Sequence, residues 1–340
     1  MRPGAAGTAD RDAIGTLWPG RRVLVTGATG LLGGWLVDAL RARGADVVCL
    51  MRDRVPRSRF HTEAIGDHAV VVRGELSDRS LLERTLAEYD IHTVFHLAAQ
   101  TIVGVARRDP LGTFESNIRG TWNLLEACRQ QRQVSAVVVA SSDKAYGAQP
   151  QLPYVEEAPL LGRAVYDVSK ACADMIAQSY AEVYGLPVGV TRCGNLFGGG
   201  DLNWSRLVPG TLRDLIGGRA PVLRSDGTQV RDYLYVEDAA AAYLRVAEVL
   251  TERPDTVAGR GFNFSHTKPQ SVLEMLENIS KAVGTEIEPV ILGEASDEIP
   301  AQYLDSSQAM AELGWEPGIG MHEGLRRTAA WYRAHLGNGG

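Results

Sequence analysis

The segment RVLVTGATGLLG, residues 22–33, decides the fold of this 340-residue chain. Its first five residues are mostly apolar and predict a short strand, and the pattern after the glycines predicts a helix at about 31–43. The GxxGxxG spacing between a strand and a helix is typical of a dinucleotide-binding turn. Gly27 would permit the tight turn, Gly30 would let a pyrophosphate approach the backbone, and Gly33 would allow close helix–strand packing. The N-terminus of the helix would then face the phosphates.

The end of the next predicted strand bears on the choice between NAD and NADP. That strand covers residues 46–51, and Arg52, Asp53 and Arg54 follow it. An acid at this place usually binds the ribose 2′-hydroxyl of NAD, whereas a base binds the 2′-phosphate of NADP. Arg52 comes first and favours NADP, and Asp53 keeps NAD open. A solvent-exposed run of charges is a third interpretation.

Four more short apolar strands alternate with helices along the first part of the chain, at residues 69–72, 93–97, 136–140 and 187–192. This alternation predicts an α/β fold with a doubly wound parallel sheet, which binds its ligands at the carboxyl ends of the strands. We interpret His96, on one of these strands, as a buried core histidine rather than a ligand. The residues predicted to bind the cofactor are Gly27, Thr29, Gly30, Leu31, Leu32, Gly33, Arg52, Glu75, Leu76, Ala98, Ala99, Gln100, Tyr166, Lys170 and Cys193.

The length of the chain suits a dinucleotide-binding domain with a smaller second lobe. Three successive glycines at 198–200 mark a loop that would cross into that lobe. We expect a disordered lead-in at 1–18, the sheet domain at 19–192 together with about 233–265, and a smaller C-terminal α/β substrate lobe at 193–232 and 266–340. Helices are expected near 80–88, 112–129, 166–184, 239–250, 271–283, 306–313 and 322–335.

Two pairs of acid–base residues occur in the motifs SSDKAYG, residues 141–147, and YDVSK, residues 166–170. Tyr166 and Lys170 are four residues apart and share one helical face, so the ammonium is expected to lower the pKa of the phenol and make it a base near neutral pH. Ser142 can hydrogen-bond the same substrate hydroxyl. Asp143 and Lys144 form a second pair, which indicates one reaction with two proton-transfer steps.

The composition narrows the classes of function. The chain has 45% hydrophobic and 22% charged residues and a net charge of −6, so we expect no nucleic-acid partner. Its four cysteines lack metal-ligand spacing, so we predict no metal site and interpret them as buried thiols of a reducing compartment. We find no apolar leader and no run of eighteen apolar residues, and therefore expect a cytoplasmic protein with no membrane span.

The chain resembles the extended short-chain dehydrogenase/reductase family of nucleotide-sugar enzymes over about residues 20–335. The resemblance rests on TGATGLLG at 26–33, HLAAQ at 96–100, NIRGT at 117–121, YDVSK at 166–170, RCGNLFGGGD at 192–201 and RDYLYVEDAA at 231–240. It implies a Rossmann domain that holds NAD or NADP tightly and regenerates it in each turnover. It also implies a C-terminal lobe that binds a nucleoside diphosphate hexose, with Asn195, Arg206 and Arg231 at the diphosphate and Leu207 and Val208 near the base.

Within the family, HLAAQ, SSDKAYG and GNLFGGGD are most similar to the CDP-glucose 4,6-dehydratases, in which an Asp-Lys pair follows Thr or Ser. Sugar 4-epimerases usually carry small residues at the positions of Asp143 and Lys144, and the CDP-glucose enzymes usually differ from this chain at RDYLYVED. The commoner hexose dehydratases carry Glu where Lys144 stands, so Lys144 would have to lose its proton to act as the C5 base. Alternatively, Lys144 binds a substrate phosphate or is a structural cation.

These residues predict a nucleotide-hexose 4,6-dehydratase with Ser142, Asp143, Lys144, Tyr166 and Lys170 as its catalytic residues. A UDP-sugar 4-epimerase, which needs only Ser142, Tyr166 and Lys170, is the alternative. A non-catalytic NAD(P)-binding regulator is a third class.

We also expect a homodimer in which the helices near 112–129 and 166–184 form a four-helix bundle. The expectation comes from the family resemblance and from residues at helical spacing on the second helix, namely Val168, Cys172, Met175, Ser179 and Val183. The alternative is that these residues pack only on the sheet of their own chain.

Overall fold

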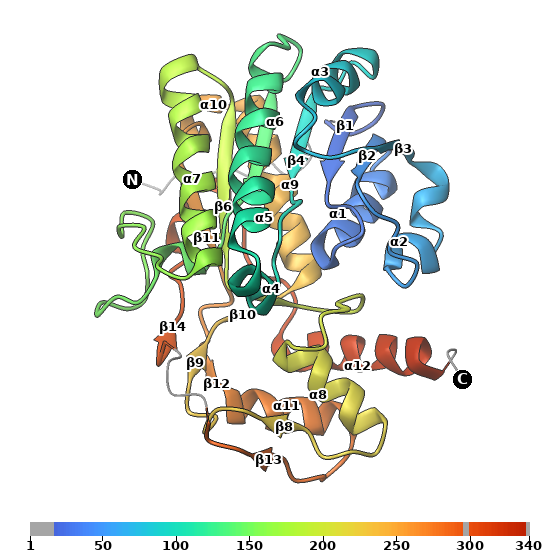
Figure 1. Ribbon diagram of the computed structural model, residues 1–340, viewed down its shortest axis with the longest axis vertical. Coiled ribbons are helices and arrows are strands. Elements are labelled where there is room, and N and C mark those ends of the chain that lie inside the picture. Colours follow the sequence, from blue (N-terminus) through green and yellow to red (C-terminus); the bar gives the residue numbers. More distant parts are fainter. Residues whose placement is uncertain (1–16, 295–298, 338–340) are drawn as a thin grey trace, which may run out of the picture.

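A seven-stranded parallel sheet is the largest element of the computed structural model, which describes residues 17–294 and 299–337 (Figure 1). The strands lie in the order β11-β6-β5-β4-β1-β2-β3. They are β1 (Arg22–Thr26), β2 (Asp46–Met51), β3 (Val70–Arg73), β4 (Thr93–His96), β5 (Ala136–Ala140), β6 (Val188–Cys193) and β11 (Gly261–Phe264). The chain order reverses between β1 and β4, and at such a point the carboxyl ends of the strands open a crevice for ligands. The predicted doubly wound α/β sheet is confirmed.

Helices cover both faces of this sheet. One face carries α3 (Arg79–Glu88), α6 (Gly120–Arg129) and α7 (Val165–Tyr184), and the other carries α1 (Leu31–Ala42) and α9 (Val236–Glu252). Side chains that alternate along β1 explain the two layers, because Leu24 packs into the α3–α6 core while Val23 and Val25 pack into the α1–α9 core. Shorter helices are α2 (Arg59–Thr62), α4 (Val103–Arg108), α5 (Pro110–Phe114) and α10 (Pro254–Val257).

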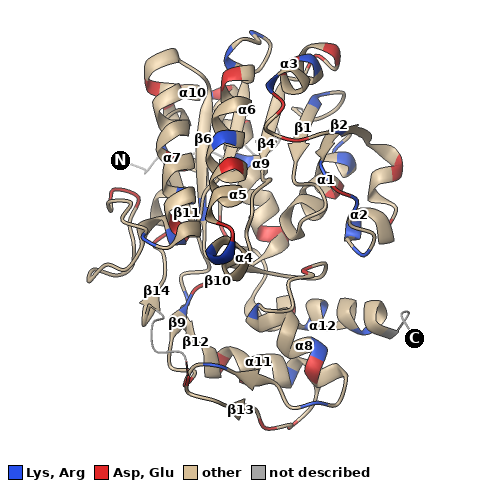
Figure 2. Ribbon diagram, in the orientation of Figure 1, with Lys and Arg blue, Asp and Glu red and all other residues tan. Residues whose placement is uncertain are grey.

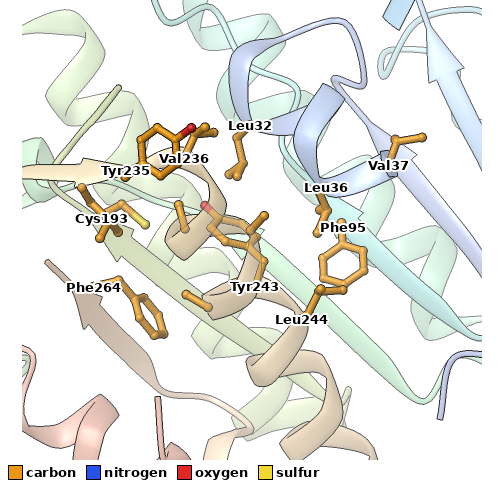
Figure 3. Close-up of a cluster of buried hydrophobic side chains, with 14 of the residues drawn as sticks. Leu32, Leu36, Val37, Phe95, Cys193, Tyr235, Val236, Tyr243, Leu244 and Phe264 are labelled. Carbon is orange, nitrogen blue, oxygen red and sulfur yellow. The ribbon is translucent and has the colours of Figure 1, made fainter. Parts of the chain in front are cut away.

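The helix α9 shows how a late segment returns to the first domain. Figure 3 shows side chains of α1, β4, β6, β11 and α9 gathered in one buried cluster, with Leu244 of α9 beside Phe95 of β4. Both side chains are almost completely buried. The following strand, β11, then completes the edge of the large sheet beside β6.

The C-terminal lobe lies below the large sheet in Figure 1 and contains helices and short strands from two parts of the chain. Its helices are α8 (Leu207–Ile216), α11 (Val272–Val283) and α12 (Met321–Gly337). Its strands are β8 (Val222–Leu223), β9 (Val230–Arg231), β12 (Gln270–Ser271), β13 (Val290–Ile291) and β14 (Ala301–Gln302). The strand β7 (Asn195–Phe197) pairs with β10 (Tyr233–Tyr235) where the chain passes between the sheet domain and the lobe. On this arrangement we propose that the predicted division at 193–232 and 266–340 describes the lobe.

Some details differ from the predictions. Residues 1–16 of the predicted lead-in lie outside the described residues, but Trp18 is buried and its indole donates a hydrogen bond to Glu248 of α9 (Nε1 to Oε1, 2.8 Å). The lead-in therefore cannot extend to residue 18. The helix expected at 112–129 consists of α5, a π-helical turn at Glu115–Arg119, and α6. Most of the helix expected at 306–313 is likewise a π-helical turn, Ala309–Leu313. Two further short turns, Ile65–His68 and Asp143–Tyr146, are 3₁₀ helices.

Figure 2 shows Lys and Arg positions interspersed with Asp and Glu positions along the ribbon of both the sheet domain and the lobe. Within the described ranges, no helix is long and apolar enough to cross a membrane. Within the same ranges, no group of three or more His, Cys, Asp or Glu side chains is arranged to hold a metal ion.

Candidate active site

A cavity of about 1730 Å³ lies between the carboxyl ends of the large sheet and the lobe. Every residue that the sequence assigned to catalysis, cofactor or substrate lines it: Gly27, Thr29, Gly30, Leu31, Leu32, Gly33, Arg52, Glu75, Leu76, Ala98, Ala99, Gln100, Ser142, Asp143, Lys144, Tyr166, Lys170, Cys193, Asn195, Arg206, Leu207, Val208 and Arg231. The structure therefore brings these residues together in one place, while their separate roles stay predictions.

The glycine-rich turn has the geometry that a bound dinucleotide requires. Gly27 has a φ of +78°, and a Cβ there would lie 2.8 Å from the backbone nitrogen of Ala98. A Cβ on Gly33 would lie 2.1 Å from the carbonyl oxygen of Gly27, so helix α1 can pack this closely only with glycine. Gly30 precedes α1 without a side-chain cap, which leaves the first N–H groups of the helix directed at the cavity. These residues fit a pyrophosphate.

Arg52 and Asp53 lie at the cavity wall beyond β2 and pair with each other. Nε of Arg52 donates to Oδ2 of Asp53 over 2.6 Å, and about 60% of each side chain is exposed (60% and 63%). The acid that would bind the 2′-hydroxyl of NAD and the base that would bind the 2′-phosphate of NADP therefore lie side by side at the cavity wall.

Tyr166 lies in the first turn of α7, and its partly buried side chain lines the cavity. Burial raises the pKa of Tyr166 to about 12, although Arg206 acts in the opposite direction. Lys170, one turn later, is buried and donates from Nζ to the carbonyl oxygen of Ala140 over 2.8 Å. Burial lowers the pKa of Lys170 to about 8, against the effect of Asp174. The prediction that Lys170 lowers the pKa of the phenol to near neutrality is therefore wrong for this structure.

Asp143 and Lys144 follow β5 in a 3₁₀ turn whose N-cap is Ser142. Ser142 Oγ donates to Oδ1 of Asp143 (2.9 Å) and accepts from the backbone N–H of Lys144 (3.2 Å). Oδ2 of Asp143 is buried without a hydrogen-bond partner, and Nζ of Lys144 lies 3.7 Å from it. One carboxylate oxygen is thus held by Ser142, while the other is buried without a hydrogen-bond partner beside the ammonium of Lys144.

Two residues of this wall had no role in the sequence analysis. Gln302 of β14 is buried and forms two hydrogen bonds to the 3₁₀ turn. Its Oε1 accepts from Nζ of Lys144, and its Nε2 donates to the carbonyl oxygen of Asp143 over 3.1 Å. Asp167, next to Tyr166, lines the cavity, and burial raises its pKa although Lys144 acts in the opposite direction. Asp167 stood inside the quoted YDVSK motif and could have been noticed, whereas no local pattern marks Gln302.

The lobe side of the cavity is formed mainly by the start of α8 and by β9. Arg206 precedes α8 and pairs with Asp201 (Nη1 to Oδ2, 3.1 Å), and Leu207 and Val208 open the helix. Arg231 lies on β9 and donates from Nη1 to the carbonyl oxygen of Val230 over 2.9 Å. Lobe residues on the same wall that had no role in the sequence-based prediction include Trp204, Arg213, Leu223, Arg224, Ser225, Val272 and Leu292.

Two predictions about buried polar residues can be checked directly. His96 lies between the hydroxyls of Thr26 and Thr121, each 2.9 Å from one ring nitrogen, and burial lowers its pKa to about 3. The interpretation as a core histidine is confirmed. Cys193 is buried at the cavity wall, and burial raises its pKa to about 12. A thiol in that state is a packing residue rather than a nucleophile.

Comparisons with known proteins agree with this geometry. The NAD dependent epimerase/dehydratase family matches residues 23–283. The chain is 32% identical over 334 residues to the CDP-glucose 4,6-dehydratase of Salmonella typhimurium, covering 94% of this chain and 92% of that one. It is also 32% identical over 338 residues to the UDP-glucose 4-epimerase of Erwinia amylovora, covering 91% and 97%. The solved structure of a dTDP-glucose 4,6-dehydratase from Streptomyces venezuelae with NAD bound is similar, with a TM-score of 0.83, 26% identity, and coverage of 93% of this chain and 98% of that one.

Proposed function

Because the chain belongs to the NAD dependent epimerase/dehydratase family, we propose that it removes water from a nucleoside diphosphate hexose to give the 4-keto-6-deoxy sugar. The observation that carries the proposal is the position of Asp143 and Lys144. Both side chains line the same cavity as Ser142 and Tyr166, so a second proton-transfer pair stands beside the first. Oxidation and epimerisation at C4 need only the first pair.

In the first step of this mechanism, Tyr166 accepts the proton of the sugar 4-hydroxyl while Ser142 orients that hydroxyl. A nicotinamide bound at the glycine turn would supply the hydride chemistry, accepting hydride from C4 and giving it up to C6, and its positive charge would favour the phenolate form of Tyr166. A ketone at C4 acidifies the C5 hydrogen, and Lys144 removes that hydrogen as a proton. Asp143 donates a proton to the 6-hydroxyl, the C6–O bond breaks, and water leaves. Lys144 finally returns a proton to C5. Tyr166 releases the proton taken from O4 and Asp143 takes one up, so the proton count of the site is restored.

We assign the cofactor site to the glycine turn, with the pyrophosphate at the N-terminus of α1. The preference between NAD and NADP rests on the Arg52–Asp53 pair. Arg52 supports a slight preference for NADP, but Asp53 neutralises part of its charge, so we propose that both cofactors bind.

The substrate diphosphate is assigned to Asn195, Arg206 and Arg231, and the base to the surface formed by Leu207 and Val208. What supports this is their position on the lobe wall of the cavity, opposite the glycine turn. A planar guanidinium binds phosphate oxygens in pairs, which suits Arg206 and Arg231 to this work. Arg206 is already close enough to Tyr166 to influence its pKa, so a diphosphate there would leave the hexose near the phenol.

We further propose that two chains associate through α6 and α7. The buried residues of α7 are Ser169, Lys170, Ala171, Ala173, Asp174 and Ala177, whereas Met175 and Val183 are exposed at 52% and 65%. The apolar residues of the predicted stripe therefore do not all pack on their own sheet, and Trp122 of α6 is exposed as well (42%). A monomeric mass in solution scattering at micromolar concentration would contradict the dimer.

The decisive experiment incubates the protein with CDP-, UDP-, GDP- and dTDP-hexoses in deuterium oxide and measures the products by mass spectrometry. A dehydratase gives a product lighter by one water and labelled with deuterium at C5. An epimerase returns a C4 epimer of unchanged mass without C5 label. A regulator that only binds NAD(P) converts none of the sugars, and that result or the epimerase result would contradict the proposal.

A further inference from the structure

Gln302 connects the lobe to the second acid–base pair. It lies on β14, is completely buried, and is 158 residues away from Lys144 in the chain. Its amide oxygen accepts a hydrogen bond from Nζ of Lys144, and its amide nitrogen donates to the backbone carbonyl of Asp143 over 3.1 Å. On the basis of the proposed dehydratase function, we propose that Gln302 is a positioning residue that holds Lys144 for proton transfer at C5.

A fixed partner is needed because a lysine ammonium sits on a flexible four-carbon stem. Lys144 is partly exposed to the cavity (24% of its side chain), so burial alone does not fix it. Gln302 is itself fixed, because its second hydrogen bond reaches the backbone of the catalytic turn. The amide oxygen is also neutral, so it holds the nitrogen in place without the full negative charge that would keep the proton on it.

The strand that carries Gln302 is attached on both sides. In the register of β14 with β9, Gln302 lies opposite Arg231, which we assign to the substrate diphosphate. Two residues further on, Leu304 forms a bridge with Tyr154, and its backbone N–H donates to Asp232 Oδ2 over 3.2 Å. The lobe strands that reach the substrate thus also reach Lys144. Lys170 is instead anchored to the carbonyl oxygen of Ala140 at the end of β5, so removal of Gln302 should impair loss of water and spare oxidation at C4.

The charge at position 302 gives a second test. Besides Asp143, whose Oδ2 lies 3.7 Å from Nζ of Lys144, the titratable groups of the described residues that interact electrostatically with the Asp143–Lys144 pair include Tyr166 and Asp167 from α7, Cys193 from β6, Asp232 after β9, and Tyr154 from the loop after β5. Gln302→Glu keeps the acceptor for Lys144 and loses the amide donor to the carbonyl of Asp143, and its negative charge beside Lys144 stabilises the charged form of that lysine. The rate of C5 proton removal should then fall at neutral pH and recover as the pH rises.

The experiment compares Gln302→Leu and Gln302→Glu with a matched control, Gln270→Leu. Gln270 lies opposite Arg231 on the other neighbouring strand, β12, and does not line the cavity. Three quantities are measured: reduction of bound cofactor on addition of sugar nucleotide, exchange of the C5 hydrogen with deuterium oxide, and reductive methylation of the chain's four lysines as a function of pH. Lys281, exposed and paired with Glu277, is the internal reference for methylation.

We expect Gln302→Leu to reduce bound cofactor like the wild type while C5 exchange falls about 100-fold, the usual effect of a misplaced catalytic group. Methylation of Lys144 should become faster in that variant and remain unchanged in Gln270→Leu. In Gln302→Glu, the pH profile of C5 exchange should move to higher pH. Equal losses of C4 oxidation and C5 exchange, or an unchanged pH profile in Gln302→Glu, would overturn the positioning role.

Methylation keeps this inference separate from the proposed function. If no hexose loses water in the wild type, the dehydratase proposal fails, and the methylation of Lys144 in Gln302→Leu still decides whether Gln302 holds it. If water is lost but Gln302→Leu changes neither methylation nor C5 exchange, the positioning role alone is wrong. Thermal melting of both variants guards against misfolding, and Gln302→Glu, which retains the size of the side chain, supplies the test if Gln302→Leu does not fold.

Discussion

The two acid–base pairs on the cavity wall are held in different ways. Tyr166 and Lys170 lie one turn apart on α7, and Lys170 is anchored to the end of the adjacent strand β5. Asp143 and Lys144 lie in a short 3₁₀ turn, and Lys144 receives a partner from β14 in the lobe. The first pair therefore depends on one helix and the sheet below it, whereas the second depends on the contact between domain and lobe. Variants of each pair should then separate two steps of one reaction.

The largest effect is expected from Tyr166→Phe. Without the phenol hydroxyl, the sugar 4-hydroxyl keeps its proton, so neither oxidation at C4 nor any later step can begin. Cofactor reduction and water loss should fall together by about 10⁴-fold, the upper end of general acid–base effects. Both are measured after addition of the sugar nucleotide found in the screen. Tyr180→Phe is the control, because Tyr180 is on the same helix and contacts Glu126 outside the cavity. Retained water loss in Tyr166→Phe would show that the first pair is not required.

The next effect separates the pairs. Asp143→Asn keeps the size of the side chain but cannot donate a carboxylic proton, so water loss should slow by about 10²–10⁴-fold while bound cofactor is still reduced. Lys144→Ala should suppress exchange of the C5 hydrogen in deuterium oxide in the same way. The measurement is mass spectrometry of the product alongside the absorbance of reduced nicotinamide. Full activity in both variants would favour the epimerase alternative, which does without this pair.

A pH profile tests the first pair without mutation. If the reactive form has a charged Tyr166 phenolate beside a charged Lys170, its population rises about tenfold per pH unit while Lys170 stays protonated. Burial lowers the pKa of Lys170 to about 8. Above that pH, Lys170 loses its proton as fast as the Tyr166 phenol does, so the fraction of protein with both groups charged stops rising. The rate of C4 oxidation should therefore rise up to about pH 8 and then level off. A rate that keeps rising to pH 10 would contradict this coupling.

The first acid–base pair is held by local structure and the second by a contact between distant segments, and this difference also explains which parts of the site the sequence could predict. The glycine turn and the Tyr166–Lys170 pair depend on spacing within one strand–turn–helix or one helix, and spacing is visible in a sequence. Gln302 reaches Lys144 only because β14 pairs with β9, and two-residue strands leave no periodic signal. The helix α8 was missed because Pro209 and Gly210 lie in its first turns, although proline is tolerated there.

Electrostatics was predicted less well than position. Tyr166 and Lys170 are neighbours on the helix as expected, but the sequence could not show how deeply the phenol would be surrounded. Burial is the largest influence on both groups, raising the pKa of Tyr166 and lowering that of Lys170. Desolvation comes from the packing of distant segments such as the lobe, so it follows from the fold and not from the motif.

The smallest effect is expected where a charge pair is both local and exposed. Arg52 and Asp53 are sequence neighbours with most of their side chains in solvent, so each contributes little to affinity. Arg52→Ala should weaken NADP by about fivefold, the upper range for an exposed ion pair, and should leave NAD nearly unchanged, since NAD lacks the 2′-phosphate. Calorimetric titration with both cofactors measures this, and Arg54→Ala is the control, because Arg54 is exposed just outside the cavity lining. Equal weakening of both cofactors, or no change for either, would remove the reason to assign Arg52 to the 2′-phosphate. Asp53 would then be the residue at this position that selects a cofactor, and its carboxylate would favour the 2′-hydroxyl of NAD.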